Sequence, residues 1–145
     1  MDNAPDYESG DLGVRTSPDV LKTNNMCKPK IKKMGGFLKA LLIGFAAAIT
    51  LAPFGIYVKE KYINNTRMIN HESIHWLQQL ELLIIFFYLW YFVEWLIKGI
   101  LGIFSKGNES AYRRISFERE AYTNDDNLEY LNTRKHYAWL KRVFK

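Results

Sequence analysis

The motif His71-Glu72-Ser73-Ile74-His75 places the strongest constraint on how this chain can fold. Each helical residue turns about 100°, so on a helix the two imidazoles lie about 40° apart on one face. In that arrangement they can bind one Zn²⁺ ion, and a catalytic zinc keeps one coordination position open for water. Glu72 can then take a proton from this water, whose pKa the metal lowers. The alternative is a surface helix that carries a glutamate and two polar histidines.

Four side chains are candidates for the third zinc ligand: Glu81, Glu118, Glu120 and His136. Glu81 occupies the position of the third histidine in metzincins, but Gln78 replaces the glycine at which the chain of those enzymes turns. The candidate histidine has no motif around it and is typical of a solvated side chain. The other two glutamates belong to the segment S-F-E-R-E-A-Y. On a helix they point about 200° apart, so only one of them can face the metal.

An H-E-x-x-H motif followed by E-x-E-A resembles the gluzincin metallopeptidases, which include thermolysin and the integral-membrane proteases of the prenyl-protein type. More closely, H-E-x-x-H-x-x-Q followed by F-E-R-E-A-Y resembles small membrane-associated bacterial proteins with this zinc signature. The resemblance covers about residues 68–125 and rests on these two motifs. It implies Glu118 as the ligand if the pattern is E-x-x-A-D, and Glu120 if it is E-A-x-x-D. We favour Glu118 slightly.

The chain departs from both family patterns at their aspartate. Tyr122 and Asn124 stand at the two positions where the patterns have that residue. The carboxylate that orients a zinc-bound histidine is therefore expected to be missing, which predicts weaker zinc binding.

Two apolar stretches predict association with a membrane. Residues 40–58 carry no charge, and a helix of this length can cross a hydrocarbon core about 30 Å thick. We therefore expect a transmembrane helix over residues 36–58, kinked or ended by Pro53. Lysines before it favour a cytoplasmic N-terminus. The alternative is a buried helix of a soluble protein.

In the second stretch, residues 82–104, Glu94 and Lys98 can pair on one helix face.

The zinc hypothesis constrains the second apolar stretch. If the motif helix continued straight across the bilayer, His71 and Glu118 would begin on opposite sides of it. The roughly 13 residues from Ser105 to Glu118 reach at most about 43 Å, and backbone inside lipid would need hydrogen-bond partners. Residues 82–104 are therefore expected to bend, to form a re-entrant pair or to lie along the interface.

The predicted fold class is all-α and membrane-anchored. Residues 1–35 are expected to be a disordered polar and basic segment, and residues 59–145 a helical domain with the zinc site. The formal net charge of +5 includes lysines before residue 40, which favours anionic lipid headgroups. No nucleic-acid-binding motif accompanies the charge. The single cysteine, Cys27, excludes an intrachain disulfide, and nothing in the sequence indicates the oligomeric state.

Together these features predict a zinc metallopeptidase of a bacterial inner membrane that hydrolyses a peptide bond near the lipid surface. Glu72 would act as general base and then donate the proton to the leaving amine. Tyr112, Tyr122 and His136 are candidates for stabilising the oxyanion. One alternative is a non-catalytic membrane scaffold with a structural metal or none. Another is an adaptor that binds a lipid surface through the bases of a C-terminal helix, Lys141, Arg142 and Lys145.

Overall fold

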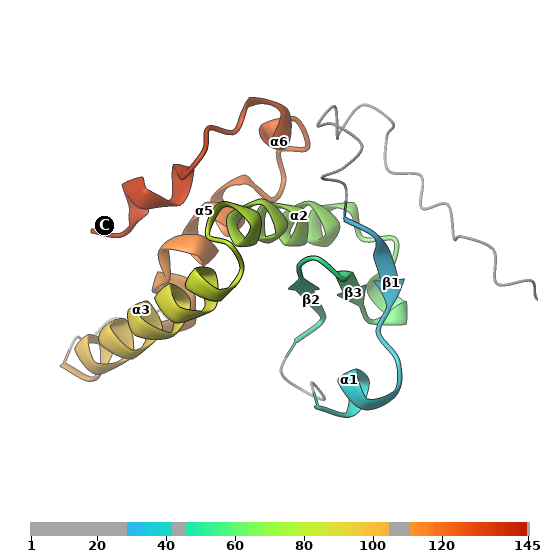
Figure 1. Cartoon of the computed structure of the whole chain (residues 1–145), viewed down its shortest axis with the longest axis horizontal. Helices are drawn as coiled ribbons and strands as arrows, with labels where there is room; N and C mark the ends of the chain where they lie inside the picture. Colours follow the sequence, from blue (N-terminus) through green and yellow to red (C-terminus); the bar gives the residue numbers. More distant parts are fainter. Residues whose placement is uncertain (1–28, 42–45, 105–110, 145) are drawn as a thin grey trace, which may run out of the picture.

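The computed structural model describes residues 29–41, 46–104 and 111–144 (Figure 1). Its first part is a three-stranded sheet with the order β1-β3-β2. β1 (Ile31–Lys33) runs parallel to β3 (Gly55–Val58), and β2 (Ala48–Leu51) runs antiparallel to β3. A short helix, α1 (Gly36–Leu41), follows β1. The predicted transmembrane helix over residues 36–58 is therefore wrong, and so is the all-α fold class.

A turn in the middle of the uncharged stretch explains why it is not one long helix. The amide of Phe54 donates to the carbonyl of Leu51 over 2.7 Å. Gly55 has a φ of 137°, and a Cβ there would lie 2.5 Å from the carbonyl oxygen of Lys30. Only glycine fits this close approach of two backbones. Burial alternates along β2 and over residues 56–58 of β3, where Ile56 and Val58 are fully buried.

The segment expected to be disordered, residues 1–35, contains β1. Residues 1–28 of that segment lie outside the described residues. The helix predicted for the histidine motif is present as α2 (Thr66–Glu81), which follows the single turn η2 (Glu60–Tyr62). The side chain of Asn65 caps α2 by accepting from the amide of Met68.

The motif helix does not continue into the apolar segment. It ends at Glu81, and α3 (Ile85–Phe104) leaves at an angle of 111°. Leu83 and Ile84 form the bend with φ values of 51° and 63°. By length and apolar composition, none of the described helices could cross a membrane alone, whereas α2 and α3 together could as a bent pair. The predicted cytoplasmic N-terminus was inferred from a spanning helix over residues 36–58, and among the residues that the structure describes there is no such helix.

The C-terminal region consists of short helices packed on α2 and α3. These are α4 (Ala111–Arg114), α5 (Ser116–Asn124), α6 (Tyr130–Thr133) and the 3₁₀ helix η3 (Ala138–Arg142). A buried cluster of Phe87, Ile115, Phe117 and Trp139 joins α3, α5 and η3. The sheet contacts α2 through β2 and β3, and α5 contacts α2 elsewhere on its surface (Figure 1). The motif helix is thus held between the sheet and α5.

Candidate metal centre

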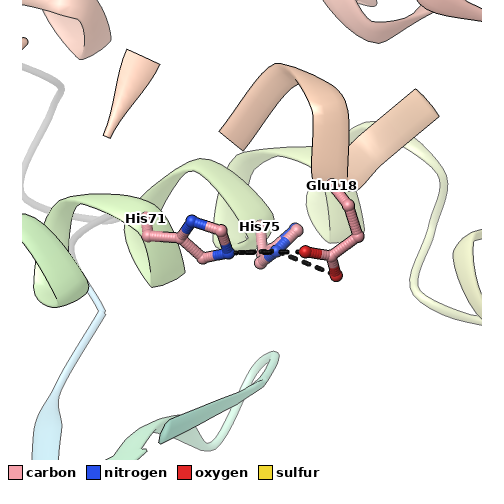
Figure 2. A group of neighbouring side chains, drawn as sticks. All are labelled: His71, His75 and Glu118. Atoms are coloured by element: carbon pink, nitrogen blue, oxygen red, sulfur yellow. Dashed lines mark hydrogen bonds and ion pairs between the residues drawn. The ribbon is translucent and has the colours of Figure 1, made fainter. Parts of the chain in front are cut away.

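Three side chains from α2 and α5 converge on one point. His71 and His75 lie one turn apart on α2, and Glu118 of α5 faces them (Figure 2). The two imidazole Nε2 atoms are 3.1 Å apart. The Glu118 Oε2 atom is 3.5 Å from His71 Nε2, and Oε1 is 3.4 Å from His75 Nε2. All three side chains are buried, and their ligand atoms lie within 4.8 Å of one another, so the group could hold a metal ion.

The other candidates for the third ligand point elsewhere. The Glu120 carboxylate is fully buried on the far side of α5, where it accepts from Arg134 Nε at 2.5 Å and from Tyr130 at 2.9 Å. The same arginine pairs with Glu81. His136 is 90% exposed and lies beside that second carboxylate. The structure therefore brings Glu118 to the histidines and places Glu81, Glu120 and His136 in or beside a separate ion-pair cluster.

A buried glutamine fixes the orientation of His75. The Nδ1 atom of the ring lies 2.7 Å from Gln78 Oε1, an acceptor, which places a proton on Nδ1 and makes Nε2 the nitrogen that would bind a metal. The amide group of Gln78 donates in turn to the Phe117 carbonyl at 3.2 Å and to Glu120 at 3.1 Å. Helix α5 therefore holds the glutamine that orients a ligand of α2.

A carboxylate also stands behind the other histidine, so the expectation that it would be missing is wrong. Asp125 Oδ2 lies 3.5 Å from His71 Nδ1, and its other oxygen accepts from Arg67 at 2.8 Å. Sequence reasoning looked for this aspartate only at the offsets of the family patterns. Asp125 could have been found from its position seven residues after Glu118, because about two helical turns bring a residue back to the same helix face.

The sheet contributes a residue that sequence reasoning missed. Thr50 of β2 donates its hydroxyl to Glu72 Oε2 at 2.7 Å. Gln79 fixes β2 against α2, because its amide group donates to the Thr50 carbonyl and its oxygen accepts from the Ala52 amide. Thr50 was missed because the β2–β3 hairpin was not predicted. A spanning helix over residues 36–58 would have placed Thr50 in lipid, away from Glu72.

The electrostatics of the centre favour a bound cation. Burial by itself would lower the pKa of His75, but the nearby Glu118 carboxylate outweighs this effect and raises the pKa to about 9. Burial also opposes the charge of Glu118, but His75 and His71 hold the pKa of this carboxyl well below its ordinary value. The Oε2 atom of Glu118 is buried and accepts no hydrogen bond from the described residues. A metal ion would satisfy this atom and replace the imidazole proton.

Two cavities meet at the centre. One, of about 280 Å³, is walled by Phe87, Tyr88 and Tyr91 of α3 and reaches His75 and Glu118. The other, of about 570 Å³, is more polar and reaches His71, Arg113 and Asp125. Both cavities are lined by Glu72 and Tyr112.

The oxyanion candidates lie at different distances from the centre. The ring centroid of Tyr122 is 4.6 Å from that of His71, and Tyr112 lines both cavities. His136, by contrast, lies beside Glu81.

Comparison of the chain with protein-family models, curated proteins and solved structures gives no match. The function of the centre is therefore inferred from its geometry and chemistry.

Proposed function

We propose that the chain is a zinc metallopeptidase with His71, His75 and Glu118 as ligands and Glu72 as general base. The observation that carries this proposal is the spacing of the ligand atoms: the two Nε2 atoms are 3.1 Å apart, and each lies 3.4–3.5 Å from one oxygen of the Glu118 carboxylate. Ligands about 2.1 Å from a tetrahedral ion lie about 3.4 Å from one another. Two imidazoles and one carboxylate are also a donor set of catalytic zinc sites, which leave the fourth position for water or substrate.

The groups around the ligands support hydrolysis. A bound zinc ion would supply a water molecule of lowered pKa and polarise the scissile carbonyl. Glu72 would accept the proton of that water and pass it to the leaving amine. The Thr50 hydroxyl holds Oε2 of this carboxylate, so we assign proton transfer to Oε1. The proposed base is 9% exposed and opens onto both cavities, where a substrate can meet it.

The cavities favour a peptide as the substrate. The apolar cavity of about 280 Å³ falls just below the range of about 300–1,000 Å³ for small-molecule sites, but it suits one side chain of a longer substrate. The second cavity lies on the other side of Glu72 and has polar walls. A peptide that passes between them would place an apolar side chain against α3 and its backbone near the metal. We place this chemistry near a lipid surface because α3 exposes many large apolar side chains.

Zinc content tests the ligand assignment. We expect about one zinc ion per chain in detergent-purified protein and none above background in His75→Ala. Glu118→Gln and Glu120→Gln form a matched pair, since both residues are buried on α5 but only the first faces the histidines. Loss of zinc in the first variant and retention in the second would support the assignment. A folded parent without zinc after reconstitution would favour the non-catalytic scaffold.

A further inference from the structure

Helix α3 turns its two charged side chains inward and most of its large apolar side chains outward. One narrow stripe faces the protein and consists of Phe87, Tyr91, Glu94 and Lys98. Apart from Gly99, every other residue from 85 to 101 is a large hydrophobic residue with at least 43% of its surface exposed. Surface helices of soluble proteins show the reverse pattern, with the apolar stripe inside and the charges outside.

Both charged side chains of α3 have their polar partners within the protein. Glu94 pairs with Lys98 at 2.5 Å, and its side chain is only 6% exposed. Its carboxylate accepts from the backbone amide of Ser116 at 2.9 Å and from the hydroxyl of the same residue at 2.6 Å. Lys98 donates to the carbonyl of Arg114. The carboxylate thus sits at the start of α5, where a negative charge complements the helix dipole.

We propose that α3 lies in the hydrocarbon of a lipid bilayer, with its outward face on the acyl chains and its charged stripe on the protein. Ionisable residues inside membranes turn toward the protein interior and pair there, as Glu94 and Lys98 do. A helix also satisfies its own backbone hydrogen bonds, which hydrocarbon requires. By length and composition α3 cannot cross the bilayer alone, so it is embedded in the hydrocarbon without forming a span by itself.

A lipid fits this face better than a second protein does. Protein interfaces contain about one hydrogen bond per 100–200 Å². The outward face of α3, over the residues that the structure describes, offers only the indole N–H groups of Trp90 and Trp95 and the hydroxyl of Tyr88, which already points at the Thr50 carbonyl. Exposed apolar patches on soluble monomers rarely exceed a few hundred Å², and those that do usually bind a partner or a membrane. Acyl chains need no polar partner from this face.

The same helix borders the metal centre. Phe87, Tyr88 and Tyr91 wall the apolar cavity that reaches His75, so one helix separates this cavity from the proposed lipid phase. If the centre is a peptidase, as proposed above, its substrate is a peptide segment held at or in the bilayer. Lipid contact itself does not depend on the metal.

Tryptophan fluorescence in vesicles tests the proposal. Of the four tryptophans, Trp90 and Trp95 are each 43% exposed on α3, whereas Trp76 and Trp139 are buried in the protein. The full chain would be reconstituted into phosphatidylcholine vesicles with or without bromine on the acyl chains, because bromine quenches indoles in contact with it. We expect strong quenching in the parent, near-complete loss of the quenched component in Trp90→Phe/Trp95→Phe, and retention in the control Trp76→Phe.

Vesicle flotation separates this proposal from the alternatives. We expect the chain to float with neutral vesicles in 1 M NaCl. We also expect bromine to quench His75→Ala as it quenches the parent. Because this variant has lost a proposed ligand, the result would show that lipid contact and zinc binding can fail independently. Three outcomes would overturn the lipid proposal: no flotation, flotation lost in high salt, or bound protein whose tryptophans bromine does not quench. A detergent-free dimer that is cross-linked through α3 and does not bind vesicles would assign the face to a second copy instead.

Discussion

Two adjacent buried glutamines of α2 allow the metal centre to be perturbed without a change to any proposed ligand. Gln78 is fully buried and Gln79 is 2% exposed. Gln78 accepts from His75 and donates to α5, whereas Gln79 joins α2 to β2. Methionine has a similar length and removes both hydrogen-bonding groups. The two substitutions should therefore weaken the fold alike but affect metal binding differently.

The expected magnitudes follow from the bonds that are lost. Each substitution leaves two or three buried polar groups with fewer partners, so each should lower the free energy of unfolding by about 1–3 kcal/mol or more. Only Gln78→Met frees the imidazole of His75 to rotate and to change its tautomer. Loss of such a partner typically weakens metal binding about 10–100-fold, which is about 1.4–2.7 kcal/mol. We expect this loss for Gln78→Met and less than about a twofold change for Gln79→Met.

Zinc dissociation constants would be measured in detergent by competition with a chromophoric chelator, and stability by thermal unfolding of the metal-free proteins. The comparison is valid only where both variants show native circular dichroism at the assay temperature. Equal zinc affinity in the parent and in folded Gln78→Met would refute the role of this glutamine. Equal losses in both variants would show that affinity follows overall stability instead of the orientation of His75.

Four further predictions concern the base, the protons of the site and the ion-pair cluster. Glu72→Gln should keep about one zinc per chain and lower peptide cleavage about 10²–10⁴-fold, as monitored by mass spectrometry of a peptide library; unchanged cleavage would exclude the assigned base. Zinc affinity should fall up to about tenfold per unit as the pH drops below about 9, because the metal must displace the proton of His75; a flat profile would contradict this competition. In the metal-free protein the same raised pKa stabilises the fold below about 6.5, and this contribution should be lost as the pH rises through about 9. Arg134→Met should destabilise the fold by about 3–5 kcal/mol in thermal unfolding, since it leaves the buried carboxylates of Glu81 and Glu120 uncompensated; a change below about 1 kcal/mol would show that water reaches them.

The spacing of His71 and His75 was predictable because both residues belong to one helix, where spacing alone fixes the geometry. The proximity of Glu118 depends on how α5 packs on α2, which no local pattern encodes, and the sequence supported it only through a family resemblance. Thr50 and Asp125 were missed for a related reason. The first acts through a contact with another element, and the second lies at an offset that differs from the family patterns.

The sheet was missed because two signals in residues 40–58 conflicted. The absence of charge over this length favours a spanning helix, whereas Pro53 and Gly55 within three residues favour a turn. The turn prevails because β2 and β3 pair with each other and β1 pairs with β3, which satisfies their backbone without a lipid environment. The same hairpin places Thr50 against Glu72, so the error in fold class concealed the residue that holds the proposed base.

The bend between α2 and α3 links the apolar segment to the metal centre. A third ligand from α5 required the chain to turn between His75 and Glu118, and it turns at residues 82–84, before the long apolar helix begins. Left-handed backbone at Leu83 and Ile84 costs about 1–2 kcal/mol per residue, and neither residue type signals a turn. Contacts beyond the bend offset this cost. Phe87 packs on Phe117 with ring centroids 4.6 Å apart, and the Glu94 carboxylate caps the start of α5. The contacts that hold α3 at this angle therefore also position the helix that carries Glu118, so the apolar helix and the proposed ligand set depend on the same packing.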